Sequence, residues 1–338
     1  MEKVASSLAN NFSKNKSLQI YLITLTNQNI FFSLSKHVKL IQPSPRKINN
    51  FIFQSFATIV FLVKLMNKHN PDSTLSFGDR YNSIVIFSGL LASSKVIISN
   101  RQNPFLSNGL FVDTLNKWMY PYAHGLICQT QIAAKVIKEK YRIERIKLIP
   151  NPVNIQVDTA NANSQRIVNV GRFGDQKNQF ELVEIFDNVR NKENWELVFF
   201  GDGAKKDKTL DRISSLKLQG KIQVLPFNIA IDQEYLQSSI FAFTSRSEGF
   251  PNALAEAMSF GCACISYDCV AGPSDIIDNG VNGFLIPEGD SKMYAEKLSE
   301  LINNIKLRTK FGTKGKEKMK RFESDKINQL YLSFILGE

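Results

Sequence analysis

Two carboxylates, Glu248 and Glu256, stand eight residues apart in a stretch of this 338-residue sequence that could bind an anion. Glu248 lies in the small polar segment 244–249, and Glu256 lies in a run of good helix formers, 252–260. Backbone N–H groups around Gly249 would be unpaired at the helix start, where they favour a phosphate. Two solvated acids beside an ordinary turn would give the same pattern, so local chemistry leaves both interpretations open.

The flanking residues predict the elements that would hold this segment. Ile240–Phe243 is a short apolar run, typical of a buried parallel strand. Pro251 suits the first helical position, where its missing N–H costs no hydrogen bond. Gly261 suits the left-handed stop just past the helix. The sequence therefore predicts a strand, a turn and a helix in direct succession.

Two basic residues after an earlier strand could neutralise the same anion. Arg172 and Lys177 follow the predicted strand Arg166–Val170. A guanidinium and an ammonium stabilise a diphosphate more strongly as it gains charge on leaving. A solvated loop is the alternative for such charges. Gly201 and Phe227 follow later strands, although a Gly-Asp-Gly turn is ordinary turn chemistry and Phe227 could equally be core.

The second half of the chain alternates strands and helices, which predicts a parallel sheet with helices on both faces. The loops after its strands should therefore converge on one edge. We expect domains at 1–156 and 157–320, with a helix at 321–338 that packs back toward the first. The five strands expected in this half are Arg166–Val170, Trp195–Phe200, Ile222–Leu225, Ile240–Phe243 and Ala263–Tyr267.

The net charge of +11 and the pI near 9.4 favour anionic partners such as nucleic acid, a phosphorylated substrate or an acidic membrane. The predicted helix Ile48–Met66 is apolar nearly all round, which fits either deep core or membrane contact. Helix Leu110–Tyr120 carries Trp118 and Lys117. We see no secretory signal and no stretch of about 18–20 apolar residues. A cytoplasmic, peripherally membrane-bound protein is expected, with its four cysteines reduced.

The literal sequence SEGFPNALAEAMSFGCACIS resembles the E-x7-E signature of the family 4 retaining glycosyltransferases, and GRFGDQKNQ resembles their G-R-x4-K pattern. The resemblance implies that Glu248 contacts donor-sugar hydroxyls and that Glu256 binds the ribose. It implies catalytic roles for Arg172 and Lys177 at the diphosphate. The other donor-site residues that it implies are Gly171, Gly201, Phe227, Gly249, Phe250, Pro251 and Asn252.

The chain departs from the family pattern in its first domain. Relatives commonly carry a histidine there near the donor, but the corresponding loop Asn100–Pro104 has none, so Arg101 and Asn103 become the acceptor-side candidates. The chain also opens directly at a helix, whereas a first strand and a Gly-rich loop are expected to come first. We therefore expect the first sheet to lack its central member and the upstream reading frame to encode that segment.

The resemblance implies a GT-B fold, an α/β architecture of two Rossmann-like domains facing across a cleft. It implies transfer of a hexose or N-acetylhexosamine from a nucleotide sugar, expected to be UDP-linked, to a growing glycan. A lipid-linked acceptor, as in O-antigen or capsule assembly, fits the basic charge. We expect no metal, no cofactor and no nucleic-acid partner. The alternatives are a nucleotide-sugar epimerase or hydrolase of the same fold, and an inactive nucleotide-sugar-binding partner subunit.

Overall fold

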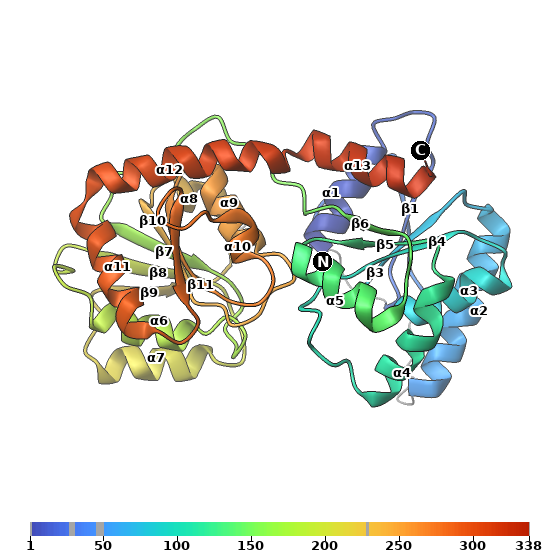
Figure 1. Cartoon of the computed structure of the whole chain (residues 1–338), viewed down its shortest axis with the longest axis horizontal. Helices are drawn as coiled ribbons and strands as arrows, with labels where there is room; N and C mark the ends of the chain where they lie inside the picture. Colours follow the sequence, from blue (N-terminus) through green and yellow to red (C-terminus); the bar gives the residue numbers. More distant parts are fainter. Residues whose placement is uncertain (1, 27–30, 45–50, 228–229, 338) are drawn as a thin grey trace. The chain divides into compact units, whose positions relative to one another are not determined.

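The computed structural model describes residues 2–26, 31–44, 51–227 and 230–337 of the chain. The chain divides into two compact units (Figure 1). Met1–Pro152 and Asp325–Glu338 form the first unit, and Val153–Ser324 forms the second. No helix in these described ranges is both long and apolar enough to cross a membrane.

The second unit is built on a six-stranded sheet in the order β12-β11-β10-β7-β8-β9, and every neighbouring pair is parallel. The four inner strands are buried nearly throughout, which explains their continuous apolar character. The strands are β7 (Arg166–Val170), β8 (Glu196–Phe200), β9 (Ile222–Leu225), β10 (Ile240–Phe243), β11 (Ala263–Asp268) and β12 (Gly283–Pro287).

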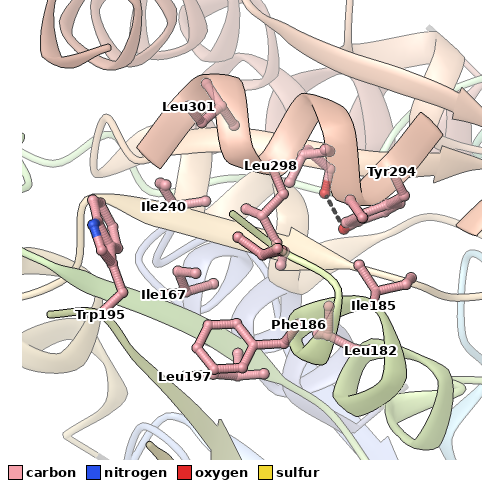
Figure 2. Close-up of a cluster of buried hydrophobic side chains, with 14 of the residues drawn as sticks. Ile167, Leu182, Ile185, Phe186, Trp195, Leu197, Ile240, Tyr294, Leu298 and Leu301 are labelled. Atoms are coloured by element: carbon pink, nitrogen blue, oxygen red, sulfur yellow. Dashed lines mark hydrogen bonds between the residues drawn. The ribbon is translucent and has the colours of Figure 1, made fainter. Parts of the chain in front are cut away.

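Helices cover both faces of this sheet, and each face has its own core. Figure 2 shows the first core, in which the Trp195, Phe186 and Leu298 side chains pack against strands β7, β8 and β10. The first core includes side chains of α6 (Gln179–Asp187), α7 (Lys206–Ser215) and α11 (Ser291–Asn303). The second includes side chains of α8 (Ile231–Leu236), α9 (Asn252–Ser259) and α10 (Pro273–Ile276), and α12 (Ile305–Met319) contributes to both.

The first unit contains two separate parallel sheets. One has the order β3-β4-β5-β6, and the other pairs β1 with β2. Among the described strands, β1 pairs only with β2, and β3 pairs only with β4. The strands are β1 (Ile20–Ile23), β2 (Val38–Ile41), β3 (Thr74–Phe77), β4 (Val96–Ser99), β5 (Gly125–Cys128) and β6 (Ile146–Leu148).

Two layers of helices enclose the four-stranded sheet (Figure 1). Helices α1 (Glu2–Phe12) and α13 (Ser324–Leu336) pack on one face, where Leu8, Tyr331 and Phe334 are buried. Side chains of α2 (Phe51–His69), α3 (Asn82–Leu91) and α5 (Gln131–Tyr141) pack on the other. Helix α4 (Leu110–Met119) packs against α3 and α5. The helix predicted over Ile48–Met66 is α2, and its first three predicted residues lie outside the described ranges.

Candidate active site

The strand order of the second unit reverses between β7 and β10, because β7 pairs with β8 on one side and with β10 on the other. The chain therefore leaves the carboxyl ends of these two adjacent strands in opposite directions. Ligands of doubly wound α/β folds bind in the crevice at such a point. The loops after β7 and β10 carry Arg172, Lys177 and Glu248.

Lys177 and Glu248 form an ion pair between these two loops, with 2.6 Å from Nζ to Oε1. Glu248 is 5% exposed, so its carboxylate is held by specific contacts rather than by solvent. The Ser245 hydroxyl donates to the same Oε1 atom. No residue of the described chain donates a hydrogen bond to Oε2 of Glu248. One carboxylate oxygen is therefore fixed by the protein, and the other can accept a hydrogen bond from a ligand.

Further contacts fix the loop after β7 against its surroundings. The buried Gln179 amide donates to the carbonyls of Gly171 and Arg172, at 3.1 and 3.2 Å. The Gln176 amide donates to the carbonyl of Ser247, which precedes Glu248, at 2.6 Å. The Thr244 hydroxyl, just after β10, donates to the Asn178 carbonyl at 3.1 Å. These bonds set the positions of both loops, so the Lys177–Glu248 contact is supported from several sides.

Arg172 is exposed, and its guanidinium makes no hydrogen bond or ion pair with the described residues. The Gly-Asp-Gly turn after β8 packs directly against its loop. A Cβ on Gly201 would lie 2.0 Å from the Gly171 carbonyl oxygen, and one on Gly203 would lie 2.3 Å from that of Phe173. Only glycine allows this backbone-to-backbone approach. Gly201 and Gly203 therefore have a packing reason to be glycine in addition to the turn that they form.

Helix α9 begins at Asn252, one residue later than predicted, because Pro251 occupies the N-cap position. Glu256 lies one turn after Asn252, and both are half-buried on the one face of α9 that is not fully packed. Gly261 has φ +82, which confirms the predicted left-handed stop.

The start of α9 is fixed by packing. The Phe250 side chain is buried against Phe322, with ring centroids 6.0 Å apart, so only its backbone can face a ligand. Pro251 packs against Gly272, where a Cβ would lie 2.4 Å from the Pro251 Cδ atom. Gly249, which precedes Phe250, is half-buried.

Phe227 follows β9 and is 44% exposed, which excludes the interpretation that it is plain core. Its side chain lies beyond the carboxyl end of the strand, as the candidates after β7 and β10 do. An exposed aromatic ring at that edge can stack on a base or a sugar.

Arg101 and Asn103 lie in the first unit, and both have protein partners. The Arg101 guanidinium donates to the Asn151 side-chain oxygen and, at 3.1 Å, to the Tyr331 hydroxyl of α13. It also lies over the Phe77 ring, 4.4 Å from the centroid. Burial lowers the Arg101 pKa. Asn103 is buried and accepts from the Phe105 N–H at 3.0 Å.

Several residues near the site were not found by sequence analysis. Ser245, Gln176 and Gln179 act through contacts that only the folded loops create, although Ser245 stands three residues before Glu248 in the same turn. Cys269 lies in the loop after β11, and burial together with the nearby charge of Glu248 raises its pKa to about 12. In the described chain, no three His, Cys, Asp or Glu residues cluster as metal ligands.

Known proteins resemble the whole chain. Residues 152–318 match the family model "Glycosyl transferases group 1". The chain is 24% identical over 320 residues to the amylovoran biosynthesis glycosyltransferase AmsD of Erwinia amylovora, covering 92% of this chain and 88% of that protein. It is 23% identical over 339 residues to a Campylobacter jejuni enzyme, covering 94% and 92% of the two chains. That enzyme is named N-acetylgalactosamine-N,N'-diacetylbacillosaminyl-diphospho-undecaprenol 4-alpha-N-acetylgalactosaminyltransferase.

Solved structures show the same fold. Anabaena HepE, determined in complex with UDP and glucose, superposes with a TM-score of 0.83 at 18% identity. The comparison covers all of this chain and 96% of that one. The lipopolysaccharide outer core galactosyltransferase WaaB superposes with a TM-score of 0.76 at 19% identity, over 99% and 95% of the two chains. The family match over residues 152–318 and the relatives named as glycosyltransferases show that the chain is a glycosyltransferase with a second unit of the group 1 type, and the solved structures show that it has the GT-B fold.

Proposed function

We propose that this glycosyltransferase moves a hexose or N-acetylhexosamine from a UDP-sugar to a lipid-linked glycan, with retention of the anomeric configuration. The reaction would take place at the cytoplasmic face of a membrane. The ion pair of Lys177 with the buried Glu248, at the strand-order reversal, is the observation that carries this proposal.

Glu248 is suited to hold the donor sugar. Its Oε1 atom is committed to Lys177 and Ser245, and its Oε2 atom can accept from a sugar hydroxyl. A charged carboxylate accepts hydrogen bonds roughly twice as strong as those between neutral groups. The family resemblance assigns Glu248 this role, and the contacts explain how the side chain would be oriented for it.

Departure of the nucleotide would be assisted by positive charge. An ammonium carries three N–H donors, so Lys177 can donate to Glu248 and to a phosphate oxygen at the same time. Arg172 is exposed and has no described side-chain partner, so it can reach the same diphosphate. The N-terminus of α9 adds its dipole. Glu256, half-buried on α9, would bind the ribose. These groups would stabilise charge that grows toward the transition state.

The donor and acceptor assignments draw support from the similar proteins. HepE was solved with UDP and glucose, which supports UDP as the nucleotide. The Campylobacter enzyme's name places its substrate on diphospho-undecaprenol, which supports a lipid-linked acceptor. The retaining outcome rests on the resemblance to family 4 enzymes. We also propose that no metal is needed, because Arg172 and Lys177 supply cationic charge for the diphosphate.

Nucleotide release by the purified chain tests this proposal. The chain is incubated with UDP-, GDP- and TDP-sugars, with and without a prenyl-diphosphate-linked oligosaccharide. We expect UDP release that requires the acceptor, persists in EDTA and yields a product with the anomeric configuration of the donor. Equal release without acceptor would indicate a hydrolase. Release from no donor, or an inverted product, would contradict the proposal.

A further inference from the structure

The net positive charge of the chain comes from its first unit. The first unit holds 20 Lys and Arg residues against 8 Asp and Glu, a net charge of +12. The second holds 22 against 23, a net charge of −1. The candidate donor residues all lie in the second unit, so the basic excess is not explained by a nucleotide bound there. The first unit must carry its charge for another reason.

The outward face of α4 and the 3-10 turn after it is apolar. Leu110 is 86% exposed, Phe111 65%, Trp118 72% and Tyr122 60%. Their positions follow the helical repeat, so they lie along one face while Val112 and Asn116 are buried on the other. Phe105 and Leu106, in the loop before α4, are also exposed. Exposed apolar groups of this size, gathered on one element, mark an interaction site.

The neighbouring helices extend this surface. Helix α3 packs against both α2 and α4, so the three belong to one side of the first unit (Figure 1). We call their outward-facing residues the apolar face. The face consists of Phe53, Phe56 and Val60 of α2, Phe87, Leu90 and Leu91 of α3, and Leu110, Phe111, Trp118 and Tyr122 on and just after α4.

The charged residues on these helices are nearly all basic. The sequences of α2 and α3 contain no Asp or Glu, and α2 carries exposed Lys64 and Lys68. On α4, Lys117 is exposed beside Trp118. Asp113 is the one acid of α4, and its carboxylate accepts from the Ser107 hydroxyl and the Asn108 N–H. The apolar face is therefore edged by unopposed lysines.

We propose that the first unit binds the surface of an anionic bilayer through this apolar face. Leu and Phe side chains would enter the boundary of the acyl chains, and Trp118 and Tyr122 would lie at headgroup level, where such rings concentrate. Lys64, Lys68 and Lys117 would attract anionic headgroups. A soluble protein partner would not account for an excess of charge spread over the whole unit, whereas a charged surface does. The binding does not depend on the proposed donor chemistry.

Vesicle flotation of the full chain tests the proposal. We expect the protein to float with vesicles of phosphatidylglycerol and phosphatidylethanolamine, and to float far less with phosphatidylcholine alone. Raising the salt concentration from about 0.1 M to 1 M should weaken the binding strongly, because the Debye length falls from about 10 to 3 Å. Equal binding to both kinds of vesicle at about 0.1 M salt, or binding to the anionic vesicles that 1 M salt does not weaken, would contradict the electrostatic part. Flotation with neither kind of vesicle would overturn the proposal.

Surface variants locate the contact. The pair Phe111→Ser and Trp118→Ser should lower partitioning about tenfold or more. Each of Lys64→Gln and Lys117→Gln should lower it about fivefold. Val157→Ser with Val281→Ser, two exposed apolar residues of the second unit, is the matched control and should bind normally. Circular dichroism and UDP affinity in solution should match the wild type for all variants.

Normal flotation of the Phe111→Ser, Trp118→Ser protein would place the contact elsewhere and overturn the proposal. Light scattering without vesicles measures the oligomeric state, and so tests whether the apolar face binds a second copy of the chain instead of a membrane. In that case the wild type forms a dimer that these substitutions dissociate, and it fails to float with vesicles. Those two results together would show that the apolar face binds another copy of the chain.

Discussion

Lys177 contacts the candidate sugar-binding carboxylate and can also contact a diphosphate. Its ammonium lies 2.6 Å from Glu248 Oε1, and 5.2 Å from the centroid of the Phe243 ring at the end of β10. These contacts hold the charge at the carboxyl edge of the sheet. Arg172 is positioned mainly through its backbone, since Gln179 bonds its carbonyl and leaves its side chain exposed. The two cations therefore differ in how firmly they are placed.

We predict that Lys177→Ala and Arg172→Ala each lower turnover about 100-fold or more, and lower donor affinity less. The physical reason is that charge on the diphosphate grows toward the transition state. Steady-state kinetics at saturating donor measure the effect. The control is Lys314→Ala, which removes an exposed lysine paired with Glu317 on α12 and should leave turnover and donor affinity unchanged. A near-normal rate for either site variant would make that residue a surface charge.

Cys269 lies close to Lys177 and Glu248, yet we predict that it is unreactive. It is 2% exposed, and burial raises its pKa to about 12. At pH 7 the thiolate fraction is then on the order of 10⁻⁵, and the thiolate is the reactive form. Iodoacetamide should leave the activity of the folded protein unchanged at pH 7, and mass spectrometry should find Cys269 unmodified. Fast loss of activity with alkylation of Cys269 would contradict this.

At the scale of elements, α13 belongs to the first unit and is held there by arginine side chains from two other segments. Arg101, in the loop after β4, bonds the Tyr331 hydroxyl and stacks on the Phe77 ring of β3. Arg145, just before β6, donates to the Phe334 carbonyl at 3.1 Å and lies over the Phe334 ring. The first unit therefore depends on residues from both ends of the chain.

We predict that Arg101→Ala destabilises the first unit by about 2 kcal/mol or more, because it removes buried hydrogen bonds of a charged group. Arg101→Lys should recover little, since a lysine cannot reproduce the fork that reaches Asn151 and Tyr331. Thermal unfolding, with hydrogen exchange over 325–336, measures the loss. Lys135→Ala, an exposed lysine on α5, is the control.

The same variants also test the acceptor-side role expected for Arg101. A normal melting temperature for Arg101→Lys, combined with a raised KM for the acceptor, would show that Arg101 contacts the substrate and does not serve mainly to hold α13 in place. A lower melting temperature with an unchanged KM for the acceptor would show that Arg101 serves mainly to hold α13 in place.

The sequence was sufficient for elements whose pattern is local. Strands β7, β9 and β10 have the predicted bounds, since each is a short run of apolar or β-branched residues that ends at a turn. Strand β6 ends at Leu148, and Pro150 and Pro152, which follow it, cannot donate to a ladder. Helix α9 begins one residue after Pro251, because the backbone of Pro251, with ψ 75, is not helical and forms the N-cap.

Contacts between distant segments could not be predicted. Lys177 and Glu248 are 71 residues apart, and their pairing follows from β7 and β10 being neighbours, which the order of strands along the chain does not show. The residues of the site were found because they resemble a known motif. Their supporting contacts, from Ser245, Gln176 and Gln179, required the folded loops.

At the scale of the whole molecule, chemistry and charge are separated. The second unit, nearly neutral, holds the candidate donor site, and the first holds the basic excess and the apolar face. This division implies that each activity can be lost without the other. UDP binding should survive substitutions on the apolar face, and vesicle binding should survive substitutions at the donor site.

Calorimetric titration with UDP tests the central claim, that the crevice beyond β7 and β10 binds the donor nucleotide. We predict that the wild type binds UDP and that Glu256→Ala binds it at least about tenfold more weakly. The reason is that losing a hydrogen bond to a charged group costs about 1.5–3 kcal/mol. Glu300→Ala, an exposed acid of α11 paired with Lys297, should bind as the wild type does. Equal UDP affinities for the wild type and Glu256→Ala, with both proteins folded, would contradict the account.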